Sequence, residues 1–224
     1  MASYQYLSKI VVATDDDTTF WKDRFIEHVT FLYSMLNERE VPELKYEALE
    51  LSSFLKSGSK IDPIHISLLY AFLETINNEI DDVVDINNAL SRDDFRDLVR
   101  HMIIEQTYYV RLISGKITVK DELLFWLQET AEHMSLISNL LPHGPLRTQT
   151  SQAADILKRT RSHAIKNPLY LMVEADLIKS ANRSAYLVND AILSGKVQID
   201  DEMLIHEIKE STRGEERVHS LLNP

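Results

Sequence analysis

The sequence contains no cysteine, which excludes disulfide bonds, thiolate-held iron–sulfur clusters and zinc sites with cysteine ligands. Glycine and proline are also scarce, with 5 and 6 residues in a chain of 224. Long stretches without turn residues favour helices over a sheet of many strands. No apolar run approaches the roughly 18 residues that a membrane-spanning helix needs. The sequence therefore predicts a helical protein that does not cross a membrane.

Basic residues are outnumbered, because 24 lysines and arginines face 35 aspartates and glutamates, and the formal net charge is −11. Nucleic acids and anionic membranes are polyanions, so neither is expected as the main partner. The first residues lack the apolar segment and cleavage site of a secretory signal. Together with the lack of cysteine, this predicts a cytoplasmic protein. An apolar content of 44% is enough for a substantial core.

The most informative feature is an internal duplication. The segment FWKDRFIEHVTFLYSML at Phe20–Leu36 recurs as FWLQETAEHMSLISNLL at Phe125–Leu141, without a gap. One offset of 105 residues relates the two copies and still holds far downstream. The polar pairs it connects include Glu27 and Glu132, His28 and His133, His101 and His206, and Glu105 and Glu210.

Turn residues divide each copy into four helical segments. The expected helices are about 18–37, 44–56, 62–88 and 91–114 in the first half, and about 120–141, 149–161, 167–193 and 200–222 in the second. We therefore expect an all-α fold, a tandem duplication of two up-and-down four-helix bundles with eight helices. The predicted domains are residues 1–115 and 116–224.

The repeated polar residues lie beside apolar stripes. His28 shares a helix face with Trp21 and Phe25, and Glu27 borders that face about 100° away. His101 and Glu105 are four residues apart and lie one turn from each other on one face. A buried carboxylate is costly unless it is paired, hydrogen-bonded or bound to a metal. Each His–Glu pair alone is consistent with a salt bridge, but retention of four positions in both halves favours a metal site.

The eight metal-ligand candidates are Glu27, His28, His101, Glu105, Glu132, His133, His206 and Glu210. Nitrogen and oxygen donors without sulfur suit iron or manganese, with zinc as a further choice. The eight candidates are more ligands than one octahedral ion binds. One ion with some residues orienting the others, two ions with bridging carboxylates, and a separate site in each half all remain open.

With these motifs, the chain resembles an uncharacterised family of duplicated helical proteins found mainly in Firmicutes and described as Bacillus cereus metalloprotein-like. FWKDRFIEH, HMIIEQTYY and the second copies FWLQETAEH and HEIKE carry the resemblance. It implies two four-helix bundles with a metal site between the repeats, the same eight ligands and ferritin-like redox or oxygen chemistry. Tyr108 and Tyr109 become Arg213 and Gly214 in the second copy, so the halves need not be equivalent. The His-x-x-x-Glu order also differs from the Glu-x-x-His of di-iron bundles.

Two other functions compete with metal binding. A metal-independent helical module could use its acidic surface to bind a protein partner. A hydrolase with histidine bases is weakly supported, because no serine or cysteine nucleophile lies in a recognisable motif. The sequence also allows a homodimer.

Overall fold

The computed structural model describes residues 4–36, 41–58, 61–79, 91–195 and 201–223. Within these ranges the chain is helical, and the only strand-like pairing is an isolated bridge between Ile10 and Thr118. The chain divides into two compact units. One is Val12–Gly115, and the other combines Lys116–Pro224 with the residues up to Val11. The residues up to Val11 thus group with the second half of the chain, and the division into domains 1–115 and 116–224 stays a prediction.

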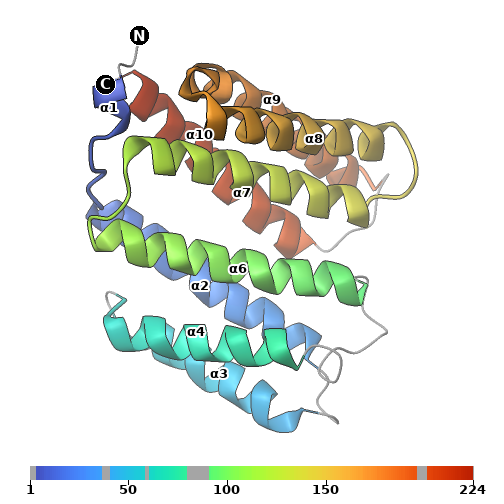
Figure 1. The fold of residues 1–224 in the computed structure, drawn as a ribbon. Coiled ribbons are helices and arrows are strands. Elements are labelled where there is room, and N and C mark those ends of the chain that lie inside the picture. The colour runs from blue at the N-terminus through green and yellow to red at the C-terminus, as the bar shows by residue number, and fades with distance from the viewer. Residues whose placement is uncertain (1–3, 37–40, 59–60, 80–90, 196–200, 224) are drawn as a thin grey trace. The chain divides into compact units, whose positions relative to one another are not determined.

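Among the described residues of the first unit are four long helices, which Figure 1 labels: α2 (Asp15–Met35), α3 (Pro42–Ser57), α4 (Pro63–Asn78) and α6 (Arg92–Ile113). Each helix packs on the next helix of this series. Helix α2 also meets α6, through the ring contacts of Trp21 with Tyr108 and Tyr109. This contact brings the two helices that carry the candidate ligands of the first repeat together.

The helix starts follow from local chemistry. Thr14 closes a capping box with Asp17 at the start of α2, so the acidic run at Asp15–Asp17 is a helix entry as expected. Asp62 accepts hydrogen bonds from the backbone N–H groups of Ile64 and His65, with Pro63 in the first turn of α4. These caps fix the rotation and start of the helices that line the core.

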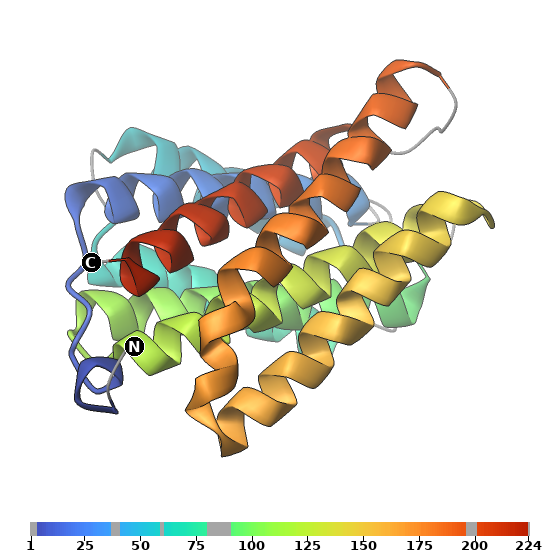
Figure 2. The ribbon, with the colours of Figure 1, turned by 90° about the horizontal axis from the view of Figure 1, so that it is seen from above.

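The second unit repeats the plan with α7 (Val119–Leu140), α8 (Pro145–Lys166), α9 (Glu174–Leu193) and α10 (Asp201–Leu222). Consecutive helices pack on one another, and α10 returns to α7 and closes the bundle. Figure 2 shows α9 in orange and α10 in red beside one another. A short helix, α1 (Tyr4–Leu7), packs on α7, and the Tyr6 hydroxyl donates to the carbonyl of Leu221.

Most of the predicted helix ends lie within three residues of those in the structure, and the exceptions are in α4, α8 and α9. Helix α4 ends at Asn78, and the expected remainder to residue 88 lies outside the described residues. Helix α8 is longer than expected and begins at Pro145, since proline is favoured in the first turn. Pro168 opens a short 3₁₀ helix, η1 (Pro168–Val173), instead of the helix that the Asp62–Pro63 pattern predicted. Asn167 there caps the end of α8 and donates to His163, so it does not start a helix.

The two cores differ beside the tryptophans. In the first unit Trp21, Phe25 and Tyr109 are fully buried and stack in edge and tilted contacts. In the second unit Gly214 lies against Trp126, and a Cβ atom added there would be 2.7 Å from the indole ring. Glycine at this position is therefore a packing requirement. Across the described ranges, every helix is too short or too polar to cross a membrane.

Candidate metal centres

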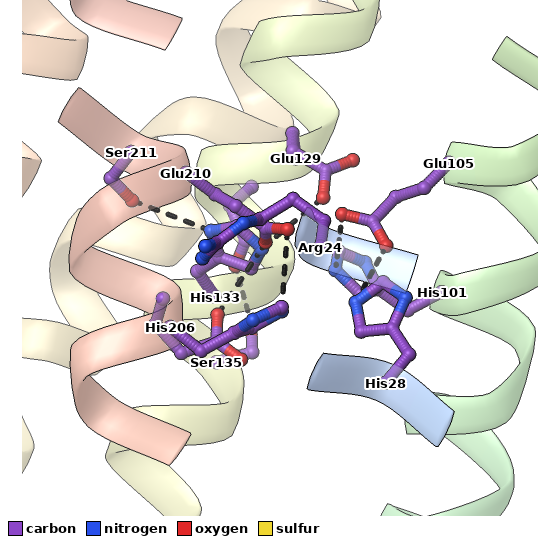
Figure 3. Close-up of polar contacts among 12 residues, drawn as sticks. Arg24, His28, His101, Glu105, Glu129, His133, Ser135, His206, Glu210 and Ser211 are labelled. Atoms are coloured by element: carbon purple, nitrogen blue, oxygen red, sulfur yellow. Dashed lines mark hydrogen bonds and ion pairs between the residues drawn. The ribbon is translucent and has the colours of Figure 1, made fainter. Parts of the chain in front are cut away.

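Each repeat presents its candidate ligands from its first and last helices. In the first repeat α2 carries His28 and α6 carries His101 and Glu105, four residues apart. In the second repeat α7 carries His133 and α10 carries His206 and Glu210. A spacing of four residues places two side chains on one helix face, one turn apart. The side chains are drawn in Figure 3.

In the first repeat a carboxylate lies between two imidazoles. Glu105 Oε2 is 3.1 Å from His28 Nε2, and Glu105 Oε1 is 3.6 Å from His101 Nε2. All three residues are buried, and Glu105 is 0% exposed. Burial of a carboxylate to this degree requires a hydrogen-bond donor or a cation close to it.

The second repeat reproduces this arrangement atom for atom. Glu210 Oε2 is 3.1 Å from His133 Nε2, and Glu210 Oε1 is 3.2 Å from His206 Nε2. Glu210 is also 0% exposed. The residues at one sequence offset thus occupy equivalent positions in space within their own units. Figure 3 marks the contacts of both carboxylates with dashed lines. We call these residues the His–Glu–His sets of the first and second repeats.

Two further carboxylates surround His133 in the second repeat. Glu129 Oε1 and Glu207 Oε2 are each 3.1 Å from His133 Nε2, so three carboxylate oxygens lie at one distance from a single nitrogen. Glu129, His133 and Glu210 each offer one ligand atom, all within 4.8 Å of one another. An imidazole Nε2 carries at most one hydrogen and makes one well-directed hydrogen bond. Three equivalent acceptors exceed what this group can satisfy.

The charge around His133 changes its proton affinity. Burial of the ring lowers the pKa of His133, but the nearby carboxylates of Glu207, Glu129 and Glu210 raise it more, and the result is a pKa of about 10. In the metal-free protein the imidazole of His133 is therefore protonated on both nitrogens and positively charged at neutral pH. A divalent cation in the same place would compensate more of the carboxylate charge than that proton does.

Glu129 and Glu207 are absent from the ligands that the sequence predicted. At the same offset the first repeat has Arg24 and Met102, so a search for residues retained in both halves removes these two glutamates. The available signal was local. Glu129 precedes His133 by one helical turn, and Glu207 lies three residues before Glu210. Both side chains are buried, at 1% exposure.

Glu27 and Glu132 are placed differently from the other six candidates. Both side chains are half-buried, and Glu27 makes two contacts with Arg24, at 2.7 and 2.8 Å. Glu132 accepts a hydrogen bond from Gln128 Nε2 at 2.8 Å. Their role as ligands stays a prediction.

A hydrogen-bond chain supports the second set from outside. The Ser211 hydroxyl is 3.3 Å from His133 Nδ1, and the backbone carbonyl of Ser211 accepts from Asn182 Nδ2 at 3.0 Å. If His133 Nδ1 carries its hydrogen toward Ser211, the lone pair of Nε2 can coordinate a cation in place of a proton. Partners of this kind orient metal-binding histidines. In the first repeat the position of Ser211 holds Gln106, which donates to the carbonyl of Ile66 instead.

The donor chemistry fits a divalent ion. The two sets contain imidazole nitrogens and carboxylate oxygens, which are the donors that iron, manganese and zinc accept. Ligands about 2.1 Å from an octahedral ion lie about 3 Å from their neighbours. The nitrogen–oxygen distances of 3.1 and 3.2 Å in the second repeat match this separation. The chain is thus an all-helical protein with buried His/Glu clusters that are able to hold a metal ion.

The fold is shared with a known structure. The chain is similar to an uncharacterised protein from Bacillus cereus G9241, with a TM-score of 0.71 and 16% sequence identity over 92% of this chain and 89% of the other. At this identity the likeness concerns the fold alone. No protein-family model matches the chain, and no curated protein matches it.

Proposed function

We propose that this protein binds a divalent metal ion, iron or manganese, through the buried histidines and glutamates of its duplicated helices. Zinc is the next choice for the same donors. The observation that carries the proposal is the group of three carboxylate oxygens at 3.1 Å from His133 Nε2. One hydrogen on that nitrogen cannot serve three acceptors, whereas a cation that replaces it attracts all of them.

The recurrence of the same arrangement supports a shared role. Glu105 and Glu210 each direct one oxygen toward the imidazole of the first helix and the other toward the imidazole of the last helix. We also propose that both repeats contribute ligands, whether the protein binds one ion or two. The residues packed around the histidine and glutamate ligands orient these side chains, and the aromatic and aliphatic core excludes water from them.

Bound iron or manganese would supply redox chemistry with oxygen or peroxide, which is the ferritin-like activity we propose for a bound ion with an open position. The protein's own contribution is the placement of the donors. Glu105 and Glu210 are held at zero exposure, and Ser211 holds the His133 ring by its outer nitrogen.

The proposal is tested by stripping the protein with a chelator and adding Mn²⁺, anaerobic Fe²⁺ or Zn²⁺ while the melting temperature is recorded. Because an ion that binds only the folded state stabilises it by mass action, the melting temperature is expected to rise with ion concentration. Ca²⁺ and Mg²⁺ serve as controls that prefer oxygen-only sites.

An unchanged melting temperature with all three transition ions, for protein that is also metal-free as purified, would remove the proposal. A metal-independent interaction module would then be the better account. In that case substitution of Glu105 and Glu210 should leave binding of a protein partner intact.

A further inference from the structure

A second candidate site lies in the second unit, on the surface between α9 and α10 (orange and red in Figure 2). It is a hollow of about 590 Å³, a volume typical of sites for small molecules. The wall from α9 includes Lys179 and Arg183, and the wall from α10 includes His219. None of these residues belongs to the His–Glu–His sets.

The basic groups of the hollow are available to an anion. Lys179 and Arg183 are exposed and one helical turn apart, so they present two cations on one face of α9. Neither forms an ion pair with any residue that the structure describes. Within the described part of the chain, no carboxylate neutralises either cation.

Two carboxylates, Glu215 and Glu216, also line the hollow, and their partners are residues other than Lys179 and Arg183. Glu215 Oε2 accepts a hydrogen bond from Asn182 Nδ2 at 2.9 Å. Glu216 contacts Arg213 at 3.7 Å, one turn back on α10. Neither carboxylate forms an ion pair with the cations of the α9 wall, which are left to a ligand.

Asn182 forms part of the lining and is 2% exposed. Its Nδ2 donates to Glu215 and to the backbone carbonyl of Ser211, and because both partners are acceptors, the orientation of the amide is fixed. Its Oδ1 is buried and accepts no hydrogen bond from the residues described. Asn77 Oδ1, at the same position of the first repeat, is likewise buried without a hydrogen bond from the residues described, so this feature belongs to the shared scaffold and not to the hollow alone.

Comparison with the first repeat shows which features are new. Asn77 occupies the position of Asn182, so the amide is common to both repeats. Lys179 and Arg183 correspond to Glu74 and Asn78, a change from a negative and a neutral residue to two positive ones. The basic wall is therefore specific to the second repeat and is not required by the helical scaffold.

We propose that this hollow binds a small phosphate monoester that carries hydroxyl groups. The phosphate would contact Lys179, Arg183 and His219, because guanidinium and ammonium groups pair strongly with phosphate oxygens. The volume exceeds that of a phosphate ion, and the Thr212 and Tyr186 hydroxyls, 3.0 Å apart, offer polar contacts to the organic part.

Calorimetric titration of the full chain with glycerol 3-phosphate, inorganic phosphate and glycerol tests the proposal. Glycerol 3-phosphate should bind one to one and more tightly than inorganic phosphate, and glycerol should not bind. Arg183→Gln and Lys179→Gln should each weaken binding at least tenfold. Arg100→Gln, an exposed arginine on α6, is the matched control and should leave the affinity unchanged. Because all three residues are exposed, the variants are expected to fold, and melting curves verify it.

Three results would overturn the proposal. The first is the absence of saturable binding of glycerol 3-phosphate at millimolar concentration. The second is an equal loss of affinity in Arg100→Gln and Arg183→Gln, which would indicate attraction by overall charge. The third is inorganic phosphate binding as tightly as glycerol 3-phosphate, which would leave no role for the rest of the hollow. None of these results bears on metal binding, because Lys179 and Arg183 lie outside the His–Glu–His sets.

Discussion

Glu105 in the first repeat and Glu210 in the second contact the same pair of histidines, but the residues around these histidines differ between the repeats. Each carboxylate lies between two imidazoles and is fully buried. Around the second set are Glu129 and Glu207, whose positions in the first repeat hold Arg24 and Met102. The duplication thus kept the His–Glu–His set and changed the residues that determine its charge.

The same contrast applies to packing. Tyr109 fills the space beside Trp21 in the first unit, whereas the backbone at Gly214 approaches Trp126 in the second. A retained tryptophan therefore has two different neighbours. Retention across repeats identifies the parts that share a role, and the differences identify what each repeat does alone. The predictions below test this comparison, from the largest expected effect to the smallest.

Tyr109→Ala and Gly214→Ala test the packing difference. Removal of the buried Tyr109 ring should lower the free energy of unfolding by about 3–5 kcal/mol, as for other large aromatic residues. Gly214→Ala gains helix propensity but forces Trp126 to move, with a net loss of about 1–2 kcal/mol. Urea unfolding measures both. A stabilised Gly214→Ala variant would contradict the close approach to Trp126.

Glu105→Gln and Glu210→Gln test the shared set. Each replacement removes a carboxylate that contacts two imidazoles, so bound metal should be lost or held about 100-fold more weakly, which corresponds to about 2.7 kcal/mol. Competition with a chromophoric chelator measures the affinity. Glu216→Gln, an exposed glutamate of α10, is the control. Wild-type affinity in both variants would show that these carboxylates are not ligands.

Glu129→Gln and Glu207→Gln test the residues found only in the second repeat. Each should weaken metal binding about tenfold, since one charged donor is lost from the group around His133. Met102→Leu, at the position that corresponds to Glu207, conserves volume and should change the affinity less than twofold. If Met102→Leu reduces affinity as much as Glu207→Gln, charge is not the property that matters at this position.

The pKa of His133 predicts a pH dependence of the metal-free protein. With a folded pKa of about 10 and an unfolded value of about 6.5, the folded state binds the extra proton between these values. This contribution to stability is complete below pH 6.5 and is lost as the pH rises toward about 10, by up to about 1.4 kcal/mol per pH unit. The stability difference between wild type and His133→Asn should therefore shrink with rising pH. A difference that grows with pH would contradict the assignment.

Ser211→Ala tests the support of the His133 ring. Loss of one hydrogen bond at 3.3 Å should weaken metal binding between twofold and tenfold, with little change in the fold. Gln106→Ala at the corresponding position of the first repeat removes a bond to the backbone of Ile66, and should lower stability without this effect on affinity. Equal metal affinities in Ser211→Ala and wild type would exclude an orienting role for the serine.

The sequence predicts the helices well because their signals are local. Thr14, Asp62 and Ser91 cap the helices that follow them, and Gly115 and Gly195 adopt positive φ at the expected helix ends. Asn167–Pro168 misleads because the backbone of Asn167 completes α8, a choice that depends on the packing of the preceding helix. The 3₁₀ turn after it has no distinct signature.

The sequence predicts only some of the residues of the candidate site. Retention at one offset identifies His28, His101, Glu105 and their counterparts, which lie together in each unit. The same filter omits Glu129 and Glu207, since each belongs to one repeat only. It also includes Glu27, whose carboxylate meets Arg24 in the structure. Identity between the repeats shows that a position was kept after the duplication. Burial and distance determine which side chains can coordinate an ion.

Elemental analysis of the native protein, purified without chelator, tests the central claim most directly. We expect iron or manganese in a fixed ratio of one or two ions per chain, and its loss from the Glu105→Gln, Glu210→Gln double variant purified in parallel. Wild-type protein without a transition metal, or a metal content that the double variant retains in full, would contradict the account.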